Sequence, residues 1–319
     1  MRVLLPGGEE LKLLTLHRLP MVEVYVDKGT NNKNLEFQAL VSTGDMRKEA
    51  LTWHARLVLN PRSLKDLPRV SIGTGIKEFT DEVAKTIEVC DIRKQTDYPR
   101  KPYHPTPGAH RSAIQGGRFI MDVWGKYSVA AAGTKSCFIA GGCDEYSDYG
   151  IAEVTEHHTT EDLLQFLGRV QMEVKGAGHA NGIVIVRHDN APEMSNDAWM
   201  KGLDQLGIKD EHTINYEKEG IGKAERSWGI MLPRARSMLL RSGCNNSFFL
   251  HAMVYSRKAL NQLTQRGTKL SRTHIFHGKP GDVSKFRIFG ARGWARLDAT
   301  VRGHKGAPVS VKCLFIGMG

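Results

Sequence analysis

The stretch IVIVRHDNAPEM, Ile183–Met194, is an aliphatic run that stops abruptly at charged residues. Four aliphatic side chains are followed by Arg187, His188 and then Asp189. Such a run is typical of a core strand in a parallel or mixed sheet. Because ligands in α/β folds bind outside the carboxyl ends of these strands, Asp189 is a candidate functional residue. The alternative is that Asp189 forms a turn or caps the next helix.

The segments on either side of this strand predict an α/β layer architecture. Apolar runs, helical spacing and capping residues indicate three strands, a helix, a strand, a short helix, a brief strand and two longer helices. Their ranges are 117–125, 136–143, 149–155, 159–174, 182–188, 195–207, 212–216, 222–241 and 246–265. This order predicts a mixed sheet with helices on both faces.

The composition is that of a soluble globular protein with free thiols. The chain has 319 residues, 40% hydrophobic and 25% charged, which suits two modest domains or one domain with extensions. No apolar run approaches the length of a membrane-spanning helix, and the N-terminus does not match a secretory signal, so we expect no membrane association. The 5 cysteines are an odd number without framework spacing, which favours a reducing compartment.

The positive charge is concentrated in the last third of the chain. Residues 225–319 hold 17 Lys and Arg against 3 Asp and Glu, a net of +14, whereas residues 1–224 hold 28 basic and 31 acidic residues, a net of −3. A basic segment attached to a near-neutral body is typical of a protein that binds a polyanion. The alternative is a basic surface that only keeps the protein soluble.

Three carboxylates lie where a metal ion would need them. Asp122 falls inside the first predicted core strand, Asp189 ends the fourth, and Glu225 lies near the start of a long helix, with 35 residues between it and Asp189. A buried aspartate requires a compensating positive charge, and Mg²⁺ prefers oxygen ligands of this kind. In the alternative interpretation, Asp122 pairs with an arginine, Asp189 caps a helix and Glu225 forms a surface ion pair.

Around these carboxylates the sequence resembles the integrase of copia-type retrotransposons, within the retroviral integrase superfamily. The family's Asp, Asp, 35 residues, Glu signature falls on Asp122, Asp189 and Glu225. Supporting matches are RHDNAPE, AER, ARSMLLRSG, NSFFLHAMVYSRKALNQL, HGKPGDVSKFRIFGARGWARLD and SVKCLFIGMG. The resemblance covers about residues 50–319 and implies an RNase H-like mixed α/β core.

The resemblance also implies an activity, its cofactors and its partners. Asp122, Asp189 and Glu225 would bind two Mg²⁺ (or Mn²⁺) ions for 3′-end processing and strand transfer of double-stranded DNA, joining element ends to a target. Lys223, Arg226, Arg234 and Arg236 would contact DNA phosphates, although a solvated helix face is the alternative. Family members act as multimers. The chemistry implies action in the nucleus after cytoplasmic synthesis, although the chain has no clear targeting signal.

The resemblance divides the chain into five parts. These are an unassigned segment 1–48, a degenerate zinc-finger-like pre-integrase module 49–98, a Pro-rich linker 99–110, a catalytic core 111–281 and a short basic extension 282–319. In the module only His54 and Cys90 match the family's zinc ligands, and Ile87 stands where a cysteine is expected. Because a structural site needs four ligands, we expect no structural zinc and ordinary packing roles for His54 and Cys90.

The core departs from the family pattern in ways that leave other functions open. Ala191-Pro192 replaces two glycines, and the helix that carries Glu225 contains Gly229 and Pro233, with a kink expected at the proline. These changes keep open a catalytically inactive DNA-binding remnant of an integrase. A third possibility is a metal-dependent nuclease of the same superfamily.

Overall fold

The computed structural model describes most of the chain. The described residues are 2–4, 10–16, 19–23, 46–85, 87, 112–212, 222–265, 267–297, 302, 304, 305 and 308–318. Within these ranges only the backbone is described for 2–4, 10–16, 19–23, 212 and 222–225.

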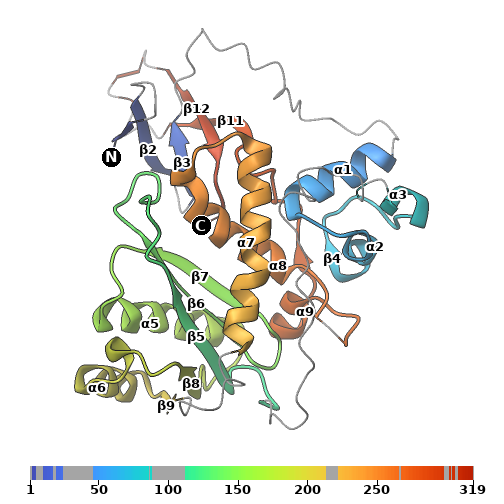
Figure 1. Cartoon of the computed structure of the whole chain (residues 1–319). Helices are drawn as coiled ribbons and strands as arrows, with labels where there is room; N and C mark the ends of the chain where they lie inside the picture. The colour runs from blue at the N-terminus through green and yellow to red at the C-terminus, as the bar shows by residue number, and fades with distance from the viewer. Residues whose placement is uncertain are drawn as a thin grey trace.

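A five-stranded mixed sheet in the order β7-β6-β5-β8-β9 forms the centre of the fold (Figure 1). The strand β6 runs antiparallel to both β5 and β7, whereas β8 and β9 run parallel to β5. The strand bounds are β5 Arg118–Trp124, β6 Phe138–Asp144, β7 Gly150–Thr155, β8 Ile185–His188 and β9 Lys209–His212. This arrangement is the expected RNase H-like mixed sheet flanked by helices, so the predicted fold class is confirmed.

Two helices cover one face of this sheet, as the apolar spacing predicts. Helix α5 (Thr160–Gly176) begins at Thr159, whose side chain forms a reciprocal capping box with Asp162. Helix α6 (Asp197–Leu206) is capped by Asn196 and preceded by a short 3₁₀ turn, η2 (Pro192–Met194). Their buried side chains share one core cluster with Phe119 and Met121 of β5.

The opposite face packs against two long helices, α7 (Gly222–Ser242) and α8 (Phe249–Asn261). A 3₁₀ turn, η3 (Asn246–Phe248), leads into α8. Ile139 of β6 joins Trp228, Met231 and Met253 in this second cluster. Because side chains alternate along a strand, the sheet separates the two clusters, and the even-numbered residues of β5 face α7.

One detail of the element predictions needs correction. The brief strand predicted at 212–216 lies earlier, at Lys209–His212, where its polar sequence pairs with β8, and residues 213–216 lie outside the described ranges. Helix α7 is continuous from Gly222 to Ser242 and passes through Pro233. These bounds are compatible with the kink expected at Pro233, which stays a prediction.

The segment 46–87 packs on α7 and α8. It contains α1 (Met46–Leu57), α2 (Pro61–Val70), β4 (Ser71–Ile72) and α3 (Asp81–Lys85). Its buried residues, among them Trp53 and Ile87, belong to the same core cluster as α8. The short strand β4 pairs in parallel with β10 (Gly281–Asp282), which follows α9 (Arg272–His277).

The first and last strands of the chain form a second five-stranded sheet, in the order β1-β2-β3-β12-β11 (Figure 1). Its strands are β1 Arg2–Leu4, β2 Glu10–Leu16, β3 Leu19–Glu23, β11 Arg292–Arg296 and β12 Ser310–Phe315. β3 pairs antiparallel with β12 although nearly the whole chain separates them. Across the described residues, none of the helices is long and apolar enough to span a membrane.

Candidate metal centre

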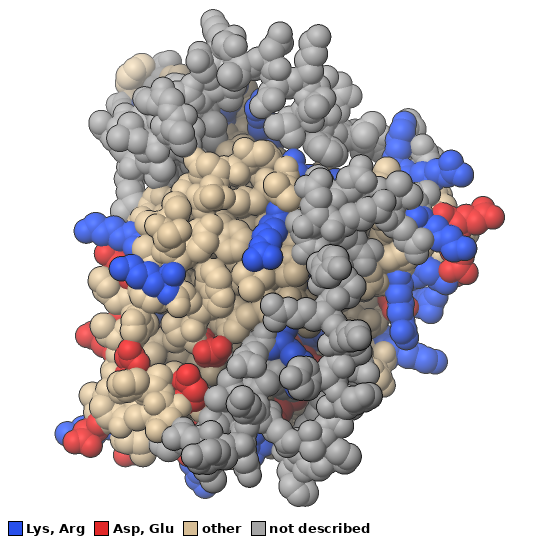
Figure 2. All heavy atoms as spheres, in the orientation of Figure 1, with Lys and Arg blue, Asp and Glu red and all other residues tan. Residues whose placement is uncertain are grey.

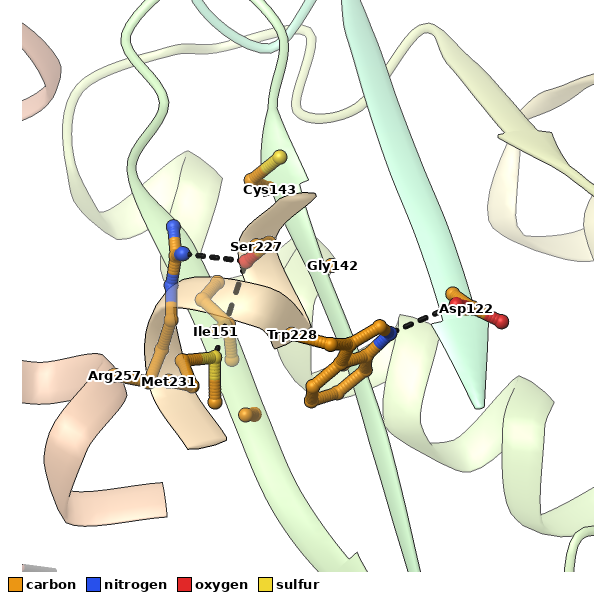
Figure 3. A pocket seen from close by; sticks show the side chains of 10 residues that line it. Asp122, Gly142, Cys143, Ile151, Ser227, Trp228, Met231 and Arg257 are labelled. Atoms are coloured by element: carbon orange, nitrogen blue, oxygen red, sulfur yellow. Dashed lines mark hydrogen bonds between the residues drawn. The ribbon is translucent and has the colours of Figure 1, made fainter. Parts of the chain in front are cut away.

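Asp122 lies on the central strand β5 and is held by hydrogen bonds from two elements. Its Oδ1 accepts a hydrogen bond from the Val123 amide at 2.8 Å, and its Oδ2 accepts one from Trp228 Nε1 of α7 at 2.7 Å (Figure 3). Each oxygen of an ionised carboxylate can accept more than one hydrogen bond or metal contact. Asp122 is therefore fixed in position by its own strand and by α7.

A small cleft opens beside Asp122, between the sheet and α7. Its lining residues are Asp122, Gly141, Gly142, Cys143, Ile151, Ala152, Ser227, Trp228, Met231 and Arg257, and its volume is about 240 Å³ including space open to solvent. A Cβ atom at Gly141, the residue opposite Asp122 on β6, would lie 2.7 Å from the Trp228 ring. The glycine therefore allows the indole to reach the carboxylate.

Asp189 follows β8 directly and comes from the strand next to Asp122. The parallel register pairs Phe119 with Val186 and Ile120 with Arg187. Continued by two residues, this register places Asp122 level with Asp189 on strands about 5 Å apart. The two aspartates therefore come from neighbouring strands.

The Asp189 carboxylate contains a buried oxygen that no donor of the described residues reaches. Its Oδ1 is shielded from solvent and has no hydrogen-bond partner among the described residues. Two nearby carboxylates form ion pairs instead: Glu145, just after β6, lies 2.8 Å from Arg118, and Glu211 of β9 lies 2.7 Å from Arg118 and also contacts Arg187. A buried carboxylate oxygen without a donor is costly, and a bound cation would remove that cost.

Asp189 does not take the capping role that was its main alternative. The residue before η2 is Ala191, and the cap of α6 is Asn196, whose side chain accepts from the Trp199 amide. The loop between them is held by a hydrogen bond of 2.9 Å from Ser195 Oγ to Asn190 Oδ1. Asp189 is therefore free of a structural role in helix initiation.

A buried histidine anchors the backbone at Asp189. His188 is 1% exposed, its Nδ1 contacts the Asp189 carbonyl oxygen, and its Nε2 lies 2.8 Å from Asp210 Oδ1. Trp199 Nε1 donates to the same Asp210 oxygen at 3.2 Å. This chain of contacts links Asp189 to β9 and α6, and local sequence patterns do not predict it.

The third carboxylate of the signature, Glu225, lies in the first turn of α7. Its side chain lies outside those described, so only its place on the helix is known. Glu225 precedes Trp228 by three residues, and residues at this spacing share one helix face. The hydrogen bond from Trp228 to Asp122 therefore brings the helix turn that contains Glu225 to the same end of β5.

A fully buried arginine ties this part of α7 to the sheet. Arg257 of α8 donates from Nη1 to Ser227 Oγ at 2.9 Å and from Nη2 to the Asp148 carbonyl at 2.6 Å (Figure 3). Burial lowers the pKa of Arg257, with partial compensation from the nearby Cys143 and Asp148. At Gly150 a Cβ atom would lie 1.7 Å from Arg257 Nε, so only glycine fits there. Neither residue was singled out from the sequence.

The four basic residues predicted to contact DNA lie along α7 in different settings. The Lys223 side chain lies outside those described, whereas Arg226 and Arg236 are exposed. Arg234 Nη1 donates to the carbonyl oxygens of Leu57 and Val58 at 2.8 and 2.9 Å, which satisfies the end of α1. Arg234 therefore has a packing contact between the two helices.

The predicted zinc remnants lie in the packed segment 46–87 or outside the described residues. His54 is 2% exposed, and its Nδ1 lies 2.7 Å from the Leu59 carbonyl oxygen. Ile87, which stands at an expected cysteine position, is 0% exposed in the core. Cys90 lies outside the described residues.

The donor set fits a divalent cation that prefers oxygen. Asp122 and Asp189 supply carboxylates from neighbouring strands, and Asp189 Oδ1 is a buried oxygen that finds no donor in the part of the chain that the structure describes. Among the described side chains, no group of three or more His, Cys, Asp or Glu is placed to hold a metal ion. Glu225, the third member of the proposed set, is not among those side chains.

Comparisons with known proteins return structural neighbours only. No protein-family model matches the sequence, and no curated protein matches it. The chain is similar to the catalytic core domain of HTLV-2 integrase in complex with magnesium, in its trimeric form at 19% identity and a TM-score of 0.41. The dimeric form of the same domain gives 20% identity and a TM-score of 0.39. Each match covers 52% of this chain and 100% of the other.

Proposed function

We propose that this chain is an integrase-like polynucleotidyl transferase in which Asp122, Asp189 and Glu225 hold divalent cations. The observation that carries the proposal is the buried Asp189 Oδ1, which has no donor among the described residues and lies one strand away from Asp122. When bound, two Mg²⁺ or Mn²⁺ ions would activate a water or hydroxyl group and stabilise the leaving oxygen of a phosphodiester.

The protein's own residues would position the reacting groups. Trp228 holds Asp122 and excludes water from one of its oxygens, and His188 fixes the backbone that presents Asp189. Arg257 keeps the start of α7 against the sheet through Ser227. Because displacement at phosphorus depends mainly on positioning and electrostatic stabilisation, this rigid scaffold suits phosphoryl transfer.

The substrate in this proposal is double-stranded DNA, at both the element end and the target. Arg226 and Arg236 are exposed on α7 and would contact phosphates, with Lys223 near the first turn. On the face shown in Figure 2, many basic side chains with acidic ones among them lie along the right edge over α1–α3, and acidic ones gather at the lower left over α5 and α6. DNA would approach along the more basic side.

The sequence resemblance supports a copia-type retrotransposon origin for this proposed integrase. Joining two DNA ends requires more than one catalytic site, so we propose a homo-oligomer that acts in the nucleus. The domain boundaries that follow the family remain part of the proposal, with a catalytic core at 111–281.

A second candidate function is DNA binding without catalysis. It is favoured by the hydrogen bond from Trp228 Nε1, which uses one acceptor position of Asp122 Oδ2. If this bond prevents a second ligand from reaching Asp122, the fold and the basic surface would persist without metal-dependent chemistry.

An oligonucleotide strand-transfer assay in Mg²⁺ and in Mn²⁺ separates the two functions. The wild-type chain is compared with Asp189→Asn, Glu225→Gln and the control Glu153→Gln, which lies on β7 and pairs with Arg169 of α5 on the opposite face. Joined products that disappear with Asp189→Asn and Glu225→Gln but persist with Glu153→Gln support the proposal. Hydrolysis without joining would identify a nuclease, and DNA binding without either product would identify the inactive module.

A further inference from the structure

A basic and aromatic surface lies on the hairpin of β11 and β12, away from the carboxylates. Arg292, Trp294 and Arg296 alternate along β11 and are all exposed, whereas Ala295 between them is buried. The three side chains therefore share one face of the strand. Trp294 is 67% exposed, an unusual value for a large aromatic side chain that is highly buried on average.

The neighbouring strand adds a third cation to this surface. Lys312 of β12 is paired with Trp294 in the antiparallel register, and its Nζ lies 5.7 Å from the centre of the indole ring. A cation–π contact of this kind contributes about 0.5–1 kcal/mol at an exposed site. This stabilises the hairpin but does not account for the two arginines or for the exposed remainder of the ring.

The surface is separate from the candidate metal centre. A Cβ atom at Gly290, two residues before β11, would lie 2.3 Å from Ser242 Cβ, so the hairpin meets the C-terminal end of α7. Trp228 lies fourteen residues earlier on the same helix, which corresponds to about 21 Å along its axis. Figure 1 shows β11 and β12 beside this end of α7.

We propose that Arg292, Trp294, Arg296 and Lys312 form a binding site for single-stranded nucleic acid. An exposed aromatic ring gives an unpaired base a stacking surface, and flanking cations neutralise successive phosphates. Bases within a duplex are already stacked and hidden from a ring on a flat strand, so the tryptophan favours unpaired bases. Among the described residues of β11 and β12 there is no Asp or Glu, which makes the face complementary to a polyanion.

The proposal goes beyond the transferase function and is tested without metal. A fluorescent single-stranded oligonucleotide of about 12 nucleotides, within the usual site size, is titrated with the full chain in EDTA, beside a duplex of equal length. The variants are Trp294→Ala, Trp294→Phe and the double variant Arg292→Gln/Arg296→Gln. Met172→Ala is the control, because Met172 of α5 is also 67% exposed but lies on a different face.

The expected pattern distinguishes stacking from simple charge attraction. Trp294→Ala weakens single-strand binding by about 5- to 100-fold with an unchanged salt dependence, while Trp294→Phe retains most of the affinity. The double arginine variant lowers the slope of log affinity against log salt by roughly 1.4. Met172→Ala changes nothing.

Two outcomes would overturn the proposal. The first is that Trp294→Ala leaves the single-strand affinity unchanged although the protein is folded by circular dichroism. The second is that Trp294→Ala weakens duplex and single-strand binding equally. Every titration is run in EDTA, so single-strand binding is measured without metal. A protein that is inactive in the strand-transfer assay can therefore still bind single strands through this surface, and an active protein can lack this binding.

Discussion

Trp228 Nε1 donates a hydrogen bond of 2.7 Å to Asp122 Oδ2 and so joins helix α7 to the central strand of the sheet. Trp228 is also 8% exposed and packs with the core between α7 and the sheet. One side chain thus couples the position of the helix that contains Glu225 to the orientation of the aspartate on β5.

Replacing Trp228 by Phe is expected to cost about 1.5–3 kcal/mol of unfolding free energy, because a buried hydrogen bond to a charged group is lost together with packing. Urea denaturation measures this cost. The matched control is Trp124→Phe, since Trp124 packs against Tyr127 and Phe249 and forms no hydrogen bond to a carboxylate among the described residues. Equal losses for the two variants would show that the bond to Asp122 contributes nothing.

Gly150→Ala is expected to destabilise the protein by about 2–4 kcal/mol, because the new Cβ would lie 1.7 Å from the buried Arg257 Nε. In an Arg257→Met background the same change should cost less than about 1 kcal/mol, since the flexible thioether can move aside. Gly176→Ala is the control, because no atom lies within 4 Å of its Cβ position. A Gly150→Ala cost that is identical in both backgrounds would disprove this clash.

The unfolding free energy should fall as the pH drops from about 7 to 5, in part because of His251. Burial lowers the pKa of His251 below its ordinary value, opposed by a contact of 3.1 Å with the Ala132 carbonyl oxygen. Below the ordinary histidine pKa, about 6.5, the unfolded chain takes up a proton that the folded chain does not, so acid favours unfolding. His251→Gln should show a shallower loss of stability over this window. An unchanged pH slope would mean that His251 does not contribute.

Treatment with a zinc chelator should leave the segment 46–87 folded, because we expect no structural zinc there. Ile87 is buried where a ligand would be needed, and His54 Nδ1 contacts the Leu59 carbonyl oxygen, so packing rather than a metal holds this segment. Purification with a strong zinc chelator is expected to leave the Tm unchanged, and elemental analysis should find less than one zinc per chain. A chelator-induced fall in Tm that added zinc reverses would contradict this prediction.

The segments that form strands β5 to β8, and the places of Asp122 within β5 and Asp189 just after β8, could be predicted because the apolar runs end at charged residues. The caps at Thr159 and Asn196 could also be predicted, since capping depends on local sequence. The strand β9 was placed too late because KDEH contains no apolar alternation. Its position follows instead from pairing with β8 and from the ion pairs of Glu211 with Arg118 and Arg187.

Contacts between distant segments could not be predicted from local patterns. The bond between Trp228 and Asp122 depends on how α7 lies over the sheet, and the contact of Arg257 with Ser227 depends on two helices at once. The pairing of β3 with β12 joins opposite ends of the chain. Helix α7 continues through Pro233, since packing can outweigh a local propensity, and the kink expected at the proline stays a prediction.

The most direct test of the central claim is the binding of Mn²⁺, measured by electron paramagnetic resonance for the wild-type chain, Asp189→Asn and the control Glu153→Gln. We expect the wild type and Glu153→Gln to bind Mn²⁺ alike. Asp189→Asn should lose more than about 10-fold in affinity, a change of about 1.4 kcal/mol, while remaining folded in EDTA. Equal Mn²⁺ affinity in all three proteins, or no binding to the wild type, would contradict a metal centre at Asp122 and Asp189.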